Sequence, residues 1–293
     1  MTDFGEVLTA MVTPFKNDSS VDYDKAQELA DYLINNGSDG LVISGTTGES
    51  PTLTSEEKLN LFKVVKEAVG NKASVIGGTG NYSTKESVEL TRKAEKTGID
   101  GCMLVGPYYN KPPQEGLFKH FKTIAESTSL PVIVYNVPSR TACNIEAETT
   151  IKLSVIENIV AVKEASGNLE QIGKISKETA DDFLIYSGDD SMTLPILALG
   201  GTGAISVASH VVGKEIKEMI TEYKKGNLTK AKDIHLKLMP LFKALFMTTN
   251  PIMVKAAVRL KGIDVGALRL PLIEATDDQI AKLKKVMEDT NVL

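Results

Sequence analysis

A lysine inside an apolar segment is the residue of this chain with the clearest chemical potential. Lys163 lies in the run Val160-Ala161-Val162-Lys163-Glu164, where β-branched and small residues alternate as in a buried strand. Burying an ammonium without a partner is costly, so such a side chain tends to lose its proton. A neutral amine attacks carbonyl carbons, which is the first step of Schiff-base catalysis. The alternatives are a strand-end lysine that reaches water and one that pairs with Glu164.

A turn with two hydroxyl groups follows another apolar run. The turn Gly45-Thr46-Thr47-Gly48-Glu49 comes directly after residues 40–44, and its two glycines permit a tight bend. The N–H and hydroxyl groups of Thr46 and Thr47 could then converge on an anion such as a carboxylate. The turn is not a P-loop, because no Gly-Lys-Ser/Thr follows it. A polar turn without a ligand is the alternative.

Phenols and one arginine follow two further apolar segments. Tyr108 and Tyr109 come after residues 101–107, and Tyr135 and Arg140 come near or after the end of residues 131–138. A phenol can transfer a proton, and a guanidinium can hold a carboxylate through two hydrogen bonds. Packing or a subunit contact for the tyrosines and a surface ion pair for Arg140 are the alternatives. Together with Lys163, these groups suit a metal-independent aldolase that acts on 2-oxo acids through an imine.

The elements that must position these residues follow a regular βα rhythm. Eight short apolar segments alternate with amphipathic stretches at intervals of about 30 residues. The predicted strands are residues 7–15, 40–46, 74–80, 101–107, 131–138, 160–166, 183–189 and 204–209. Eight such units predict a TIM (β/α)8 barrel, whose active sites lie at the carboxyl ends of the strands. A doubly wound sheet is the competitor, but no G-x-G-x-x-G follows the first strand.

The strand pattern stops after residue 225. Residues 228–249 have a helical pattern that Pro240 is expected to kink or interrupt. Asn250-Pro251 reads as an N-cap followed by a first-turn proline, opening a helix to about Lys261. A last helix is predicted from about Asp277 to Met287. The chain therefore divides into a catalytic barrel, residues 1–225, and a C-terminal α-helical domain, residues 226–293.

Composition narrows the functional classes. The 293 residues have a net charge of -5 and no basic stripe, which argues against a nucleic-acid partner. No apolar run approaches the length of a membrane span, and the segment from Met1 to Glu6 has no signal-peptide pattern. Two cysteines fit a reducing cytoplasm, and three scattered histidines make a His/Cys metal site improbable. We expect a cytoplasmic enzyme without a resident metal.

Three of these motifs together resemble the N-acetylneuraminate lyase/dihydrodipicolinate synthase superfamily. They are the stretch from Gly40 to Glu49, the sequence Tyr135-Asn136-Val137-Pro138, and Lys163, which follows Tyr135 by 28 residues. The resemblance extends over essentially the whole chain. Thr46-Thr47 and Ser139-Arg140 are more similar to the dihydrodipicolinate synthase branch than to the neuraminate lyases, which typically show Ser-Thr in the turn and lack the arginine.

This resemblance implies a lyase that condenses pyruvate with L-aspartate 4-semialdehyde. The product would be 4-hydroxy-tetrahydrodipicolinate, in the first committed step of the diaminopimelate route to lysine. Lys163 would form an imine with pyruvate and no other cofactor would be needed, while Thr46 and Thr47 hold the pyruvate carboxylate. Tyr135 would be the general acid/base, linked through Thr46 to Tyr109, which in the family reaches across a tight dimer interface.

The remaining roles implied by the resemblance concern the second substrate and the assembly. Arg140 would hold the semialdehyde carboxylate, and Gly188 and Ile205 would supply backbone contacts, Ile205 through its carbonyl. Family members are commonly homotetramers built as dimers of tight dimers. Another pyruvate-dependent aldolase, of the N-acetylneuraminate or 2-keto-3-deoxygluconate type, and a non-catalytic binder of 2-oxo acids are the alternative functions.

The chain departs from the lysine-inhibited members of the family at three positions. Ser55 and Lys58 stand where those members carry a histidine or a glutamate–tryptophan pattern, and Tyr82 stands where they carry an asparagine. A cationic Lys58 would repel the ammonium of a bound lysine. We therefore expect weak or absent feedback inhibition by lysine.

Overall fold

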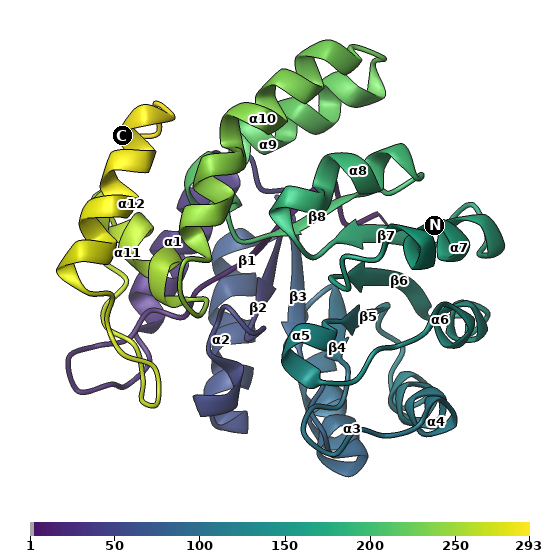
Figure 1. The fold of residues 1–293 in the computed structure, drawn as a ribbon. Helices are drawn as coiled ribbons and strands as arrows, with labels where there is room; N and C mark the ends of the chain where they lie inside the picture. Colours follow the sequence, from purple (N-terminus) through teal and green to yellow (C-terminus); the bar gives the residue numbers. More distant parts are fainter. Residues whose placement is uncertain (1–2) are drawn as a thin grey trace.

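Eight parallel strands close into a barrel surrounded by helices in the computed structural model, which describes residues 3–293 (Figure 1). Met1 and Thr2, at the start of the segment for which no signal peptide is expected, lie outside the described residues. Each strand pairs with its sequence neighbours, and β1 also pairs with β8. The strands are β1 Val7–Ala10, β2 Gly40–Ile43, β3 Ser74–Gly78, β4 Gly101–Val105, β5 Val132–Asn136, β6 Ile159–Glu164, β7 Leu184–Ser187 and β8 Gly203–Ser206. The predicted TIM barrel is confirmed.

Helices connect the strands on the outside of the barrel. They are α1 Tyr23–Asn35, α2 Ser55–Val69, α3 Thr84–Glu95, α4 Gln114–Ala125, α5 Pro138–Thr141, α6 Ala147–Ser154, α7 Leu169–Glu178, α8 Thr193–Ala198 and α9 Ser209–Lys224, with short 3-10 turns at Ser50–Thr52 and Asp190–Met192. Local sequence sets where two of them begin. Thr54 and Glu57 form a capping box at the start of α2, and the Ser83 side chain accepts the Glu86 N–H at the start of α3.

Side-chain alternation divides each strand between two apolar layers. Ile133, Tyr135 and Ala161 point into the barrel and join its interior cluster. Val134 and Val162 point outward into a second cluster, which lies beneath the helices. Because successive strand residues face opposite sides, Lys163 faces the interior like Ala161. The register places it beside Tyr135 of β5 and Tyr186 of β7.

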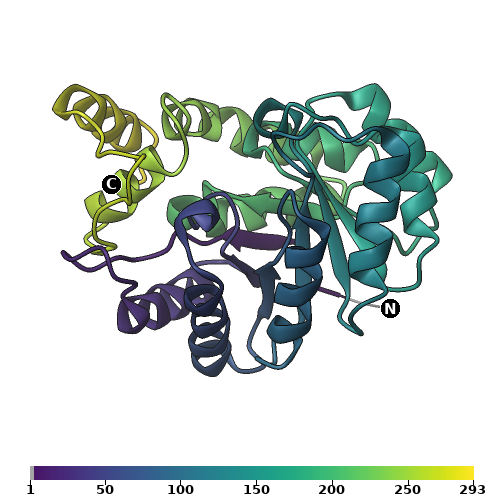
Figure 2. The same cartoon turned by 90° about the horizontal axis from the view of Figure 1, so that it is seen from below.

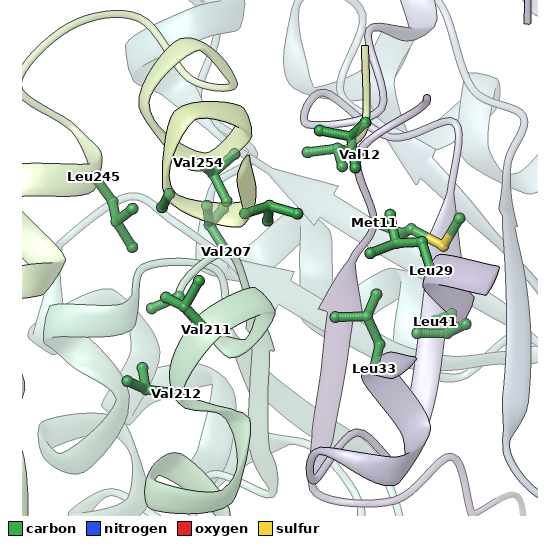
Figure 3. Packing of buried hydrophobic residues seen from close by; sticks show 14 of the residues in the cluster. Met11, Val12, Leu29, Leu33, Leu41, Val207, Val211, Val212, Leu245 and Val254 are labelled. Atoms are coloured by element: carbon green, nitrogen blue, oxygen red, sulfur yellow. The ribbon is translucent and has the colours of Figure 1, made fainter. Parts of the chain in front are cut away.

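Three C-terminal helices pack along one side of the barrel, where they run from green to yellow in Figures 1 and 2. They are α10 Leu228–Leu245, α11 Ile252–Leu260 and α12 Asp277–Asp289. Their apolar residues share one core with α1, α2 and α9, and Figure 3 shows Val254 of α11 close to Val207 and Val211. Among residues 3–293, no helix combines the length and apolar character that crossing a bilayer requires.

Two details of the C-terminal helices differ from the sequence predictions. Pro240 lies inside α10, which continues past it to Leu245, so the expected interruption is wrong. Asn250 is not the N-cap of α11: that position is Pro251, and no side chain caps the helix. The Asn250 amide instead donates to the Thr47 hydroxyl at 2.9 Å. A tertiary partner on the barrel thus takes the side chain that local sequence would assign to helix capping.

Candidate active site

Lys163 lies at the carboxyl end of β6 with its side chain inside the barrel. It is 5% exposed, and its Nζ lies 4.2 Å from the centroid of the Tyr135 ring on β5. The neighbouring Glu164 faces outward, where its carboxylate accepts hydrogen bonds from Asn136, Ser166 and Gln171. The structure therefore supports neither a lysine that reaches water nor one that pairs with Glu164.

The surroundings of Lys163 favour its neutral amine. Burial lowers the pKa of the Lys163 side chain to about 7, because the ammonium loses its hydration inside the barrel. The Asp190 carboxylate opposes this shift, and the Arg140 guanidinium adds to it. At neutral pH a large share of these side chains is therefore unprotonated and nucleophilic.

Asp190 is a buried carboxylate that is held in place by donors from the end of β8 and from the two residues between β8 and α9. It accepts hydrogen bonds from the hydroxyl of Ser206 and from the N–H groups of Val207 and Ala208. These donors replace the hydrogen bonds to water that the carboxylate loses on burial. Asp190 therefore provides a fixed acceptor at the strand ends that moderates the charge state of Lys163.

Tyr135 is a buried phenol beside the amine. Burial raises its pKa to about 12, against the opposing effects of Arg140 and of the Thr46 hydroxyl. A phenol with this pKa stays protonated at neutral pH. Tyr135 is thus a proton donor in its resting state and can accept a proton only as it gives one up.

The turn that carries Thr46 and Thr47 has a constrained backbone. Ser44 and Glu49, which bracket it, both adopt the left-handed conformation with φ of 56°. Such angles cost energy for residues with a Cβ and persist where the surroundings enforce them. Gly48 is not left-handed, and a Cβ there would lie 3.1 Å from the Met11 carbonyl oxygen. The glycine at 48 therefore provides close packing rather than a special φ.

One cavity of about 220 Å³ gathers most of the predicted site residues. Its lining comes from the carboxyl ends of several strands and from the segment that joins α10 to α11. The lining residues are Thr46, Thr47, Tyr135, Val137, Ser139, Arg140, Lys163, Ala165, Gly188, Asp189, Val207, Phe246 and Asn250. Six of the eight predicted residues meet there, because parallel strands end at the same rim.

Gly188 leaves space beside the lysine. A Cβ at this position would lie 2.9 Å from the Ala165 Cβ and 3.2 Å from the Lys163 Cε. The Gly188 N–H also donates to the Glu164 carbonyl at 2.8 Å, which ties the end of β7 to β6. A side chain at 188 would press on the lysine and reduce the room for a substrate.

Two of the predicted residues lie outside this cavity. Ile205 is buried in the barrel interior on β8, and Tyr109 is 92% exposed with a left-handed φ of 75°. The ring of the adjacent Tyr108 instead packs edge-on against Tyr82, at 5.1 Å between centroids. Within one chain, Tyr109 therefore does not join the cavity that contains Lys163.

A second cavity of about 210 Å³ adjoins the first and shares Thr46, Tyr135, Val137 and Arg140 with it. Its other walls are largely apolar or small residues. They are Ser44, Gly45, Ser50, Pro51, Gly78, Gly80, Met103, Val105, Tyr108 and Thr141. Tyr135 and Thr46 therefore separate the lysine from an apolar space large enough for an aromatic side chain.

Two lining residues come from the C-terminal helices and were not predicted from the sequence. Phe246 directly follows α10, and Asn250 lies in the connector to α11, more than 80 residues after Lys163. The Asn250 carbonyl accepts a hydrogen bond from Arg140 at 3.4 Å. Residues at strand ends can be predicted from the barrel pattern, but these two lie outside the barrel strands. The polar Asn250 after an apolar helix was the available signal, and it fitted helix capping equally well.

The cavity is surrounded by functional groups of the protein itself. Within residues 3–293, His, Cys, Asp and Glu side chains form no group of three or more that could hold a metal ion. The groups around the cavity are an amine, a phenol, hydroxyls, a guanidinium and backbone amides. This arrangement can form a covalent adduct with a carbonyl compound and bind carboxylates at two ends of it.

Comparisons with known proteins agree with this geometry. The model of the dihydrodipicolinate synthetase family matches residues 3–290. The chain belongs to this family. A 4-hydroxy-tetrahydrodipicolinate synthase of Desulforamulus reducens is 56% identical over 292 residues, covering 99% of each chain.

Solved structures of dihydrodipicolinate synthases share the whole fold. A lysine-bound enzyme from Cyanidioschyzon merolae has a TM-score of 0.97 at 51% identity and covers 99% of each chain. A synthase described as the first monomeric variant has a TM-score of 0.96 at 43% identity, and the match covers 99% of this chain and 98% of that one. The similarity includes the C-terminal helices, because coverage is nearly complete.

A third cavity of this family member lies between α2 and α3 and has a volume of about 260 Å³. It contains Ser55, Lys58 and Tyr82, the three positions on which the expectation about lysine inhibition depends. Burial lowers the pKa of Lys58, while the carboxylate of Glu86 opposes the shift. Lys58 therefore places its own amine near Glu86, an acidic group that an added ammonium would seek.

Proposed function

We propose that this chain condenses pyruvate with L-aspartate 4-semialdehyde to give 4-hydroxy-tetrahydrodipicolinate, with Lys163 as the nucleophile. The observation that carries the proposal is the position of Lys163: a buried amine with a pKa near 7 beside a protonated phenol, in one cavity with a guanidinium. The family supports the reaction, which is the activity that its relatives' names give. The enzyme is a lyase of lysine and diaminopimelate biosynthesis.

The first half of the reaction joins pyruvate to the protein. The neutral Lys163 Nζ attacks the keto carbon, and the keto oxygen leaves as water to give an imine. Backbone N–H groups at Thr46 and Thr47 hold the pyruvate carboxylate. Loss of a methyl proton then converts the imine into an enamine, with the lysine nitrogen as the electron sink. No separate cofactor is needed, since the imine itself provides the activation.

The second half forms the new carbon–carbon bond. The enamine carbon attacks the aldehyde of L-aspartate 4-semialdehyde, and Tyr135 gives a proton to the developing alkoxide. Arg140 at the cavity rim holds the semialdehyde carboxylate, while backbone groups at Gly188 and Ile205 contact the bound molecules. Attack of the substrate amine on the imine then closes the ring and frees Lys163 by transimination.

Tyr109 extends the proton path from a second subunit in this proposal. Tyr109 is 92% exposed on its own chain, and the apolar cavity behind Tyr135 and Thr46 has room for an aromatic side chain. A partner subunit's Tyr109 placed there would continue the relay through Thr46 to Tyr135. We therefore propose a homo-oligomer with at least a tight dimer, and a tetramer formed from two such dimers.

Regulation and location complete the proposal. We propose weak or absent inhibition by lysine, because Lys58 already places an amine near Glu86 in the cavity between α2 and α3. We also propose a cytoplasmic enzyme that uses no nucleic acid or membrane partner. Both cysteines, Cys102 and Cys143, are free thiols, as expected in a reducing compartment.

Borohydride trapping tests the central step. Incubating the protein with pyruvate and borohydride should reduce the imine and leave a stable added mass on Lys163, located by peptide mass spectrometry. Lys163→Ala should show no such adduct. A wild-type protein that remains unmodified under these conditions would contradict the enzymatic function and favour a non-catalytic binder of 2-oxo acids.

The second substrate separates this synthase from other pyruvate-dependent aldolases. We expect turnover with aspartate semialdehyde, and we expect Arg140→Ala to raise the KM for it about 10- to 100-fold, as losing a charge-assisted hydrogen bond does. Pyruvate trapping by Arg140→Ala should persist. Cleavage of N-acetylneuraminate or 2-keto-3-deoxygluconate by the wild type, without turnover of the semialdehyde, would favour the alternative.

A further inference from the structure

A fully buried ion pair joins the C-terminal helices to the turn that carries Thr46 and Thr47. The Lys255 Nζ on α11 lies 2.8 Å from the Glu49 Oε1, and both side chains have no exposed surface. Glu49 ends the turn, and its Oε2 also accepts the Arg269 N–H at 3.0 Å. Lys255 in addition donates to the Ala267 carbonyl at 2.7 Å and lies 4.4 Å from the centroid of the Phe15 ring.

This ion pair has no part in the chemistry proposed for the cavity. Lys255 does not line the space around Lys163. Burying two charges is expensive, and a core of apolar side chains could hold a helix here at least as well. A buried pair at this place therefore calls for an explanation other than stability.

The turn is the element that the pair restrains. Glu49 is left-handed, so its backbone stays in this conformation only where its surroundings hold it. Further restraints on the turn include the Thr13 hydroxyl, which donates to the Gly48 carbonyl at 2.7 Å, and the Asn250 amide, which donates to the Thr47 hydroxyl at 2.9 Å. Since the Thr47 oxygen accepts from Asn250, the Thr47 hydrogen is free to point at a carboxylate.

The segment that follows α11 is fastened over the same loops. Gly266 is left-handed, with φ of 65°, and a Cβ there would lie 1.7 Å from the Phe15 carbonyl oxygen. The Arg269 side chain donates to the carbonyls of Ser19 and Thr52 and pairs with Glu57 at the start of α2. Lys255 and Glu49 lie beneath this layer, which excludes water from their contact.

We propose that Lys255 and Glu49 are positioning residues for pyruvate, which hold the N–H groups and hydroxyls of the turn in the geometry that receives its carboxylate. The proposal rests on the proposed function, because it takes pyruvate as the molecule bound at the turn. Neither residue touches the substrate. Both act through the backbone of the turn, so their loss should weaken pyruvate capture more than it affects the later steps.

Lys255→Met tests the proposal by leaving Glu49 buried without its cation. We expect the pyruvate concentration for half-maximal borohydride trapping on Lys163 to rise about fivefold or more. The KM for the semialdehyde at saturating pyruvate should change less than about twofold. The double variant Glu49→Gln/Lys255→Met has no uncompensated charge but also no ion pair, so its pyruvate half-saturation should stay above the wild-type value. A return to the wild-type value would show that the unpaired charge, and not the lost restraint, caused the change, and would overturn the positioning role.

Arg259→Met is the matched control. Arg259 lies one turn further along α11 and pairs with Glu274 of the C-terminal segment instead of with the turn. It should keep the wild-type pyruvate half-saturation even if its melting temperature falls. If Arg259→Met raises the half-saturation as much as Lys255→Met does, general loosening of the C-terminal helices explains both and the positioning role is wrong.

A second single variant covers a failure of Lys255→Met to fold. Glu49→Gln keeps an acceptor for the Arg269 N–H and should raise the pyruvate half-saturation about threefold or more. A folded single variant with unchanged pyruvate half-saturation overturns the positioning role. The two levels of inference remain distinguishable: a wild type that pyruvate never traps contradicts the proposed function, whereas a normally trapped wild type with unaffected variants contradicts only the positioning role.

Discussion

At the scale of single residues, Lys163 shows how the fold controls the charge of a side chain. The amine is within reach of the cavity but cut off from bulk water, so its pKa falls to about 7. That shift makes the amine reactive, and it also makes the folded state less favourable wherever the unfolded chain would keep the proton. The same burial therefore predicts both a reactivity and a cost in stability.

This cost should appear as a pH-dependent difference between wild type and Lys163→Met. Between pH 7 and the ordinary lysine pKa of 10.5, the unfolded chain binds a proton at this residue that the folded chain does not. The wild-type free energy of unfolding should therefore rise with pH across this window, with the full penalty present below pH 7. The free energy of unfolding of Lys163→Met minus that of the wild type should therefore be about 3 kcal/mol larger at pH 7 than at pH 9.5.

Urea unfolding without pyruvate, at one protein concentration, measures this difference. Lys152→Met is the control, because Lys152 is exposed on α6. Its stability relative to wild type should be the same at both pH values. An identical difference for Lys163→Met at pH 7 and pH 9.5 would show that Lys163 titrates like a free lysine.

The amine of Lys58 should determine how well lysine inhibits the enzyme. Replacing it with glutamine removes the amine that lies near Glu86, so an added lysine ammonium could take its place. We expect Lys58→Gln to lower the lysine concentration for half-inhibition about tenfold or more relative to wild type. A coupled activity assay measures it, with Lys85→Gln, an exposed position on α3, as the control. Micromolar inhibition of the wild type would show that Lys58 does not exclude lysine.

At the scale of elements, the outward side of β5 and β6 supports the inward side. The Glu164 carboxylate accepts from Asn136 at 3.1 Å and from Gln171 of α7 at 2.9 Å. Asn136 in turn bonds the backbone of Ile145 and the side chain of Asn144, in the segment that follows α5, the short helix that carries Arg140. Strands β5 and β6 hold Tyr135 and Lys163 in register partly through this network.

Glu164→Ala should therefore destabilise the fold by about 2–4 kcal/mol, because the buried amide of Asn136 and the half-buried amide of Gln171 lose their acceptor. Chemical or thermal unfolding measures the loss. Glu178→Ala, on the exposed end of α7, should stay within about 0.5 kcal/mol of the wild type. Equal effects of the two substitutions would mean that the network adds nothing to stability.

The same elements show what sequence reasoning could and could not reach. Short apolar segments at βα intervals were enough to predict all eight strands, because barrel strands are buried on both sides and therefore read as apolar runs. Their ends were predicted too late. The first strand ends at Ala10 rather than Phe15. Residues 11–15 resemble a strand in sequence because they are buried as strand residues are, although they are not paired in the sheet. The contacts of Asn250 and Lys255 with the turn cross about 200 residues, and no local pattern encodes them.

At the scale of the whole molecule, the C-terminal helices complete the site as well as the core. Their apolar residues join the cluster that includes α1 and α9, while Phe246 and Asn250 form one wall of the cavity. We therefore propose residues 226–293 as a helical domain that works with the barrel, residues 1–225, rather than apart from it. Because the helices bury much of their surface on the barrel, their removal should affect the site directly.

The exposed Tyr109 should act in the active site of a partner subunit. If each site takes Tyr109 from its partner, Tyr109→Phe and Tyr135→Phe should both be impaired, and mixed dimers of the two should regain one intact site. Random exchange of subunits at equal amounts makes half of the dimers mixed, so activity should recover to about a quarter of the wild-type value.

Unfolding and refolding the two variants together, followed by the coupled assay, measures this recovery. The double variant Tyr109→Phe/Tyr135→Phe mixed with wild type contains the same residues in the same amounts, yet its mixed dimers hold no intact site. Its activity should come almost entirely from wild-type dimers that reform. If Tyr109 served its own chain, the first mixture would show only the mean of the two variants, since no combination of their chains would place both tyrosines in one site.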